Sequence, residues 1–358
     1  MKVGDLGSRS ASWDPLAAFV DSCSAARPCR PYPAGAASLV LLLVSLLGGG
    51  PAEASTPAPN ASWTGVSHPT VLYEAPAEQS RVLAVVPAQD QEGLPVAVRV
   101  DQLVDREGVA WIKTRFGSTR GWIPAAGLPP ANATPLSPVL LSALSASLKR
   151  AGAGASAVFA DSNGQTLFAR QASRTRILAS NVKMFVTAAA LDRLGSVVGP
   201  LLGRILRPSD NWLAQKLLDR LAPSRAERIR IAEGFAHRIG ARVHLVDGSG
   251  LGRASRAAPT DVVAFLVGMR LTPTFALWRD ALPVTGRSGT LAGRMRGSAA
   301  EGSCQAKTGT LRDVSTLSGY CTTSSGRRVV LSILFNDIAP WRGRLLQDQM
   351  VTSLVRLG

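Results

Sequence analysis

The stretch Leu178-Ala-Ser-Asn-Val-Lys-Met-Phe-Val-Thr-Ala-Ala-Ala-Leu191 decides how this chain is interpreted, because it places a serine and a lysine at the start of an apolar helical run. Ser180 and Lys183 are three residues apart, and positions i and i+3 of a helix lie on one face. The lysine amine can therefore reach the serine hydroxyl, which is one way to activate a nucleophile. We predict a helix here, with a reactive serine at its start.

Two further motifs follow in order, Ser209-Asp210-Asn211 and Lys307-Thr308-Gly309. The set Ser-x-x-Lys, Ser-Asp-Asn and Lys-Thr-Gly is typical of penicillin-binding proteins and class A β-lactamases. Each motif alone has a simpler explanation, because both serines could cap helices and the third motif could end a strand at a turn. Lysine is scarce, however, and only Lys183 follows a serine by three positions. Three motifs in this order favour a functional interpretation.

The length, hydrophobic fraction and charge of the chain limit the classes of protein to which it can belong. A chain of 358 residues predicts about two domains beyond a processed leader, and a hydrophobic fraction of 46% is ample for a core. The formal net charge is +16, but the arginines are scattered and form no basic run interleaved with aromatic residues. We therefore expect no nucleic-acid partner. A weak attraction to an anionic cell wall stays open.

Residues 1–54 are interpreted as a signal peptide. A short apolar stretch, Ala36–Leu47, follows Arg27 and Arg30, and Ala52-Glu-Ala54 offers a small-x-small cleavage site. The stretch is too short to span a bilayer comfortably, although an uncleaved anchor is the alternative. We expect an exported protein of the periplasm or cell wall.

A small β-domain is predicted between two linkers. Residues 55–65 and 129–138 are rich in Pro, Ala, Ser or Thr and read as linkers, while short β-prone runs separated by turn residues fill 66–128. Two of these runs, 111–115 and 119–128, resemble the closing strands of a bacterial SH3-like domain. The resemblance implies a small β-barrel that binds cell-wall peptides or packs on a partner domain.

Two tryptophans of this β-domain, Trp111 and Trp122, could stack on a ligand. Core positions are the more usual place for such residues, and we expect them there.

The two cysteines outside the leader suggest a covalent cross-link. Cys304 and Cys321 flank a predicted turn at residues 310–314 almost symmetrically, so an antiparallel hairpin would bring them opposite each other. A disulfide is expected, with two buried free thiols as the alternative. The histidines are dispersed, at His68, His237 and His244. No metal site and no organic cofactor is predicted.

Several longer stretches then point to one family: Asp247–Arg253, Leu282–Arg294, Ala306–Leu311 and Leu317–Tyr320. They closely resemble the D-alanyl-D-alanine carboxypeptidase/endopeptidase family of low-molecular-mass penicillin-binding proteins (class C type). The resemblance implies an α/β (α+β) serine β-lactamase/penicillin-binding transpeptidase-like fold over 139–358, with a central antiparallel sheet and flanking helices. Strands predicted near both ends of this region agree, because they indicate termini that share one sheet.

The resemblance implies cleavage of peptidoglycan stem peptides through an acyl-enzyme, and acylation by β-lactams. Ser180 would be the nucleophile. With no histidine near the motifs, an uncharged Lys183 is the candidate base, neutralised by burial and by the nearby cation Lys307. Ser209 would relay a proton to the leaving nitrogen, and Asn211 would hold Lys183 or the substrate.

The third motif would bind the substrate. Lys307 would supply positive charge and Thr308 a hydroxyl for the terminal carboxylate. Gly309 would let the backbone approach closely. The N–H groups of Ser180 and Thr310 would form the oxyanion hole. In the Asp-Gly-Ser-Gly loop, Ser249 and Arg253 are interpreted as structural.

One departure from the family is large. The family carries a long insertion between its first two motifs, whereas here 209 − 183 = 26 positions separate Lys183 from Ser209, and residues 192–208 look like a bare connector. A catalytically decayed wall-binding protein is therefore one alternative. A β-lactamase is another, although Glu227 and Glu233 lack the Glu-x-x-Leu-Asn context of a deacylation base. Carboxypeptidase and endopeptidase action are not separated.

Overall fold

The computed structural model describes residues 62–66, 69–89, 96–106, 108–116, 119–125 and 135–358. The expected signal peptide, and most of both predicted linkers, lie outside the described residues.

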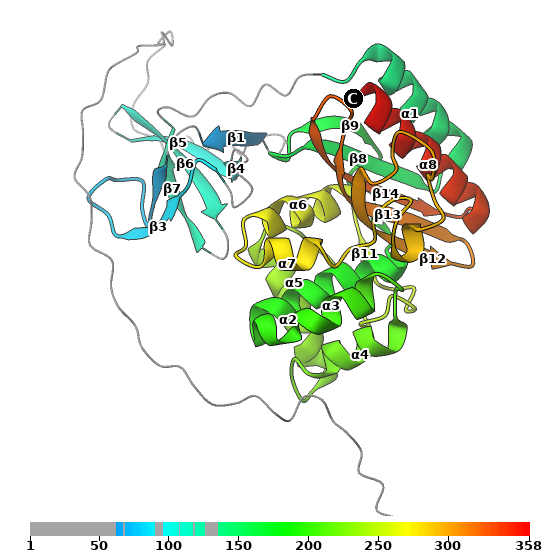
Figure 1. The fold of residues 1–358 in the computed structure, drawn as a ribbon. Helices are drawn as coiled ribbons and strands as arrows, with labels where there is room; N and C mark the ends of the chain where they lie inside the picture. Colours follow the sequence, from blue (N-terminus) through cyan, green and yellow to red (C-terminus); the bar gives the residue numbers. More distant parts are fainter. Residues whose placement is uncertain (1–61, 67–68, 90–95, 107, 117–118, 126–134) are drawn as a thin grey trace, which may run out of the picture. The chain divides into compact units, whose positions relative to one another are not determined.

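Residues 135–358 are built on one five-stranded antiparallel sheet with the order β12-β13-β14-β8-β9. Its strands are β8 (Ala155–Asp161), β9 (Thr166–Arg170), β12 (Cys304–Leu311), β13 (Val314–Thr322) and β14 (Arg328–Asn336). Two strands come from the start of this region and three from its end, as the sequence predicted (Figure 1). A short pair, β10 (Arg176–Ile177) with β11 (Arg256–Ala257), forms a separate ladder.

Two helices, α1 (Pro138–Ala151) and α8 (Pro340–Leu357), lie side by side over one face of the sheet (Figure 1). In α1 the fully buried residues are Leu140, Leu144 and Leu148, a spacing of four that keeps them on one stripe of the helix. This stripe forms a core with the sheet and α8, and fixes the last helix against the strands that carry the third motif.

The other helices form a layer on the opposite side, and they are α2 (Val182–Leu194), α3 (Gly199–Leu206), α4 (Asn211–Asp219), α5 (Arg225–Arg238), α6 (Pro259–Arg270) and α7 (Phe275–Arg279). Three 3₁₀ turns accompany them, η1 (Ala179–Asn181), η2 (Ser196–Val198) and η3 (Gly289–Leu291). Every residue of α2 from Val182 to Leu191 is buried. A helix that is apolar all round belongs in the middle of a layer, and α2 holds that place against α3, α4 and α5.

The connector at 192–208 is where the sequence interpretation was wrong. It folds into η2 and α3, and Leu202, Ile205 and Leu206 of α3 are buried. Their spacing of three and four is that of an amphipathic helix, which the short segment length concealed. The turn predicted at residues 310–314 is shorter than expected, because β12 continues to Leu311 and the next strand begins at Val314.

Residues 62–125 form a small all-β unit. A five-stranded antiparallel sheet has the order β3-β2-β7-β6-β5, and β1 pairs with β4. The strands are β1 (Ser62–Val66), β2 (Thr70–Tyr73), β3 (Val82–Val86), β4 (Val96–Val100), β5 (Gln102–Arg106), β6 (Val109–Phe116) and β7 (Thr119–Pro124). The first strand lies mostly inside the segment predicted as a linker, because its pairing with β4 orders that backbone.

The core position expected for Trp111 is confirmed: its side chain is buried and packs edge-on against Tyr73. Trp122 is half-buried, with the Lys113 ammonium 5.4 Å from the ring centre. An SH3-like barrel stays a prediction. None of the described helices is long and apolar enough to cross a bilayer.

Candidate active site

The first motif brings a hydroxyl and an amine into contact. Ser180 lies in η1, one turn before Lys183 in α2, and the Lys183 Nζ is 2.9 Å from the Ser180 Oγ. No side chain caps the N-terminus of α2, so the simpler explanation of Ser180 as a helix cap does not apply. The spacing of three residues therefore produces the contact that the sequence predicted.

Lys183 is held by two further oxygen atoms. Its Nζ donates to the Asn211 Oδ1 at 2.7 Å and to the Ser249 carbonyl. The side chain is fully buried, and this burial lowers the pKa of Lys183 to about 8, against the carboxylates of Asp247 and Asp210, which raise it. A neutral amine would keep two N–H groups for Asn211 and Ser249 and a lone pair for the proton of the Ser180 hydroxyl.

Neighbouring residues of the second motif have different roles. Asp210 is the N-cap of α4, and its carboxylate accepts the Leu213 N–H at 2.8 Å. Ser209 is thus not the cap; its hydroxyl accepts from the Lys307 Nζ at 2.9 Å. Ser209 adopts φ 63°, a left-handed conformation that costs a non-glycine residue about 1–3 kcal/mol and is concentrated at functional sites.

The positive charge expected on Lys307 stays a prediction. This side chain is fully buried, and burial together with the charge of Lys183 lowers its pKa well below the ordinary value. Its Nζ donates to Ser209 and, at 2.8 Å, to the Thr308 carbonyl. These two acceptors hold the Lys307 amine beside the second motif.

Gly309 allows the nucleophile turn to lie directly on the sheet. A Cβ added here would be 2.2 Å from the Thr316 Oγ1 and 2.9 Å from the Leu178 carbonyl oxygen. The space that a side chain would need at Gly309 is thus taken by the chain's own Ser180 turn.

Buried polar side chains of the sheet hold that turn, and the sequence interpretation missed them. Thr316 donates to the Leu178 carbonyl at 3.1 Å, Asn336 accepts the Ile177 N–H at 2.9 Å, and Ser318 accepts from the Asn181 side chain at 2.8 Å. Thr316 and Ser318 are two residues apart in a strand and share a face. Polar residues with this period in an apolar strand were the available signal.

The edge of β12 is half covered. The Ala306 N–H donates to the Pro283 carbonyl at 2.9 Å, and the Thr285 N–H to the Cys304 carbonyl at 3.0 Å. Even-numbered residues of β12 therefore turn their backbone groups outward, and the period of two places Thr308 and Thr310 the same way. Thr310 is exposed. This orientation is the one required of an oxyanion-hole N–H.

The loop 247–253 is closer to the site than its structural interpretation suggested. Asp247 accepts the N–H groups of Gly250 and Gly252, each at 2.6 Å, which shapes the loop so that the Ser249 carbonyl meets Lys183. Arg253 forms a two-pronged ion pair with Asp313, at 2.7 and 2.9 Å, which ties the loop to the turn after β12.

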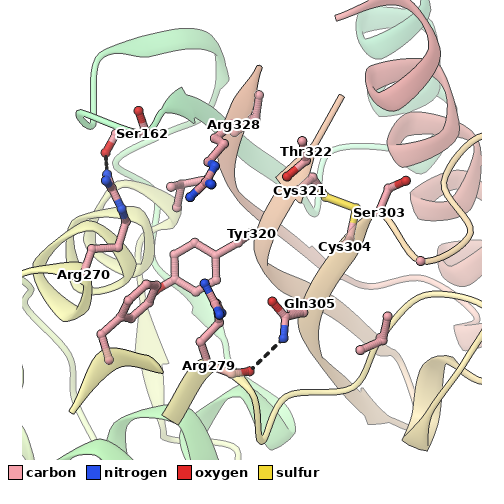
Figure 2. Close-up of a pocket in the computed structure, with 15 residues that line it drawn as sticks. Ser162, Arg270, Arg279, Ser303, Cys304, Gln305, Tyr320, Cys321, Thr322 and Arg328 are labelled. Carbon is pink, nitrogen blue, oxygen red and sulfur yellow. Dashed lines mark hydrogen bonds between the residues drawn. A yellow bond between two sulfur atoms is a disulfide. The ribbon is translucent and has the colours of Figure 1, made fainter. Parts of the chain in front are cut away.

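Cys304 and Cys321 are paired in the β12–β13 register and form a disulfide. Beside it lies a cavity of about 530 Å³ that includes Arg270, Arg279 and Arg328 among its lining residues (Figure 2). This cavity does not contain the Ser180 site. In the described part of the chain no group of three or more His, Cys, Asp or Glu could hold a metal ion.

Comparisons with known proteins show what the C-terminal part of the chain is similar to. Residues 200–357 match the model of the D-Ala-D-Ala carboxypeptidase 3 (S13) family. The D-alanyl-D-alanine carboxypeptidase of Actinomadura sp. (strain R39) is 45% identical over 115 residues, 31% of this chain and 21% of that protein. Carboxypeptidase DacB of Mycolicibacterium smegmatis is 30% identical over 181 residues, 44% of this chain and 38% of that protein.

The chain thus spans between one fifth and two fifths of the length of these relatives. Among solved structures, a class A β-lactamase representative from Bacteroides cellulosilyticus covers 63% of this chain and 98% of its own, with a TM-score of 0.52 and 15% identity. That likeness shows the fold, which is of the serine β-lactamase/transpeptidase-like class. The C-terminal part of this chain therefore resembles D-Ala-D-Ala carboxypeptidases in sequence and a class A β-lactamase in fold.

Proposed function

We propose that this protein is a serine D-alanyl-D-alanine carboxypeptidase that acts on peptidoglycan stem peptides through an acyl-enzyme. The observation that carries the proposal is the 2.9 Å contact between the Ser180 hydroxyl and the buried Lys183 amine. Two fixed oxygen atoms orient that amine, and burial lowers its pKa toward neutrality. An amine that is partly neutral near physiological pH can act as a general base.

Acylation follows from these positions. The Ser180 Oγ attacks the carbonyl carbon of the scissile amide while its proton moves to the Lys183 Nζ. The oxyanion lies between the N–H groups of Ser180 and Thr310, a type of stabilisation worth about 10²–10³ in rate per donor. The hydroxyl of Ser209 gives its proton to the leaving nitrogen, and the C–N bond breaks.

The proton that Lys183 accepted passes to Ser209 through Lys307, whose Nζ donates to the Ser209 oxygen, so that Lys183 is neutral again. Water then attacks the ester. One of its protons moves to Lys183, the bond to the Ser180 Oγ breaks, and the serine recovers its hydrogen. The proton count closes without metal or cofactor.

β-Lactams are expected to acylate the same serine, because their strained amide presents the same carbonyl. The site gives no support to rapid release of the antibiotic through a glutamate. Glu233 accepts the Leu245 N–H at 2.7 Å, and Glu227 lies in the first turn of α5. We therefore favour a long-lived adduct over β-lactamase turnover.

Export to the periplasm or cell wall, where such peptides occur, is part of this proposal. It rests on the leader composition. Association of the N-terminal β-unit with the wall is a further part, supported by its resemblance to SH3-like domains.

Labelling with a fluorescent penicillin tests the proposal. We expect a covalent band with the wild type, no band with Ser180→Ala, and release of D-alanine from a peptide that ends in D-Ala-D-Ala. A folded wild-type protein that gives neither band nor D-alanine overturns the proposal and favours a wall-binding protein without activity.

A further inference from the structure

The substrate proposed above ends in a carboxylate, and the site must offer it a cation. Lys307, the predicted cation, is fully buried, and its Nζ already donates to the Ser209 hydroxyl and the Thr308 carbonyl. Lys183 serves as base. Arg253 is already engaged by the Asp313 carboxylate. An exposed cation at the open edge of β12 would therefore add a charge that the three motifs do not bring to the surface.

The arginines of the cavity in Figure 2 are not placed for this role. That cavity adjoins Gln305 and the disulfide, at the start of β12. Thr310 lies five residues further along the strand, roughly 17 Å away at the usual rise per residue. A carboxylate beside Thr308 and Thr310 would lie beyond their reach.

Arg344 is placed to offer a cation to this carboxylate. This residue of α8 is exposed, and its Nη2 donates to the Thr310 Oγ1 at 3.3 Å. Its guanidinium has no carboxylate within ion-pair distance among the described residues, unlike nearby Arg294, which pairs with Asp348 at 2.6 Å. Arg344 thus brings an uncompensated charge to the open edge of β12.

Two hydroxyls complete the surroundings. Thr310 is exposed, whereas Thr308 is buried and its hydroxyl lies 2.7 Å from that of Thr290 of η3. A guanidinium presents several N–H groups in a plane and matches the two oxygens of a carboxylate. An arginine that reaches a threonine hydroxyl can therefore share one anion with it.

We propose that Arg344 is a specificity-determining residue that, with the hydroxyls of Thr308 and Thr310, receives the free C-terminal carboxylate of the substrate. The inference rests on the proposed function and deepens it, because it makes the enzyme selective for peptide acids over peptide amides. Loss of a charge-assisted hydrogen bond is expected to weaken binding of the acid about 10- to 100-fold. Since Arg344 is exposed, added salt should reduce the effect.

The experiment measures binding in the Ser180→Ala background, so that turnover does not interfere. The probe is diacetyl-L-lysyl-D-alanyl-D-alanine, compared with the same peptide carrying a C-terminal amide. Isothermal titration calorimetry gives both dissociation constants. The variants are Arg344→Gln and Arg344→Lys.

Arg342→Gln is the matched control. Arg342 lies on the same helix and is exposed, but its guanidinium donates to the Arg150 carbonyl at 2.9 Å instead of to the site. We expect Arg344→Gln to weaken binding of the peptide acid about 10- to 100-fold and to leave binding of the peptide amide unchanged. Arg344→Lys should restore part of the lost affinity for the acid, and Arg342→Gln should change neither dissociation constant.

An equal loss for acid and amide in Arg344→Gln, or no loss at all, overturns the role of Arg344. The proposed function fails separately, when wild-type protein with Ser180 intact forms no penicilloyl adduct and releases no D-alanine. If the acid is preferred equally by every variant, the carboxylate is held elsewhere while the peptidase proposal stands.

Discussion

The pH dependence of acylation should report the ionisation of Lys183. Burial lowers the pKa of this amine to about 8 in the free protein. Such a group is about one-tenth neutral at pH 7, half neutral at pH 8 and about nine-tenths neutral at pH 9. If only the neutral amine takes the Ser180 proton, the second-order rate of acylation rises about tenfold between pH 7 and pH 9 and then levels off.

A chromogenic penicillin in stopped-flow experiments at constant ionic strength gives this rate. The variant Asp210→Asn gives a second test, because asparagine also caps helices well but lacks the carboxylate that raises the pKa of Lys183. We expect the midpoint to move to lower pH in this variant. A rate that is flat or falls between pH 7 and 9, or a midpoint that moves upward, would refute the assignment of Lys183 as the base.

Three other outcomes are expected. Because Lys183 has a lower pKa when folded than when unfolded, the unfolded chain binds more protons between pH 8 and 10.5, and this group should raise the free energy of unfolding by about 3 kcal/mol across that window. Lys307 adds a rise of the same sign, so denaturant titrations at several pH values should show a rise about 3 kcal/mol smaller in Lys183→Met than in wild type, and an equal rise in both would contradict the lowered pKa of Lys183. Gly309→Ala places a Cβ 2.2 Å from the Thr316 hydroxyl, and we expect thermal melting to show a loss of about 1–3 kcal/mol of unfolding free energy, together with slower acylation. Adding Thr316→Ala should relieve part of both effects, and unchanged stability of Gly309→Ala would contradict the close approach. Replacing both Cys304 and Cys321 by alanine opens a loop of sequence separation 17 and should cost about 3 kcal/mol of unfolding free energy, with no change in stability arguing against the bond.

Short-range geometry is what the sequence predicts best. The contact of Lys183 with Ser180 depends on one helical turn, and the pairing of Cys304 with Cys321 depends on one hairpin. Both follow from regular spacing between residues that are close in sequence. The sheet made from both ends of the region also followed from the order of its strands.

Contacts that depend on tertiary packing could not be predicted from the sequence. The Ser249 carbonyl reaches Lys183 only because glycines shape its loop, and Thr316 meets the nucleophile turn only through the sheet register. The complete burial of Lys307 is another such feature, which no local pattern of residues reveals. Arg344 is distant from every motif in sequence, and only the packing of α8 brings it to Thr310.

The most direct measurement of the central claim is the rate at which Ser180 acquires a penicilloyl group with and without its neighbouring amine. Time-resolved intact-mass spectrometry of wild type and Lys183→Ala gives both rates, and peptide mapping locates the adduct. We expect the adduct on Ser180 and a rate at least ~10²-fold slower without the amine, the usual contribution of a general base. An unchanged rate in folded Lys183→Ala, or an adduct on another residue, would contradict the account.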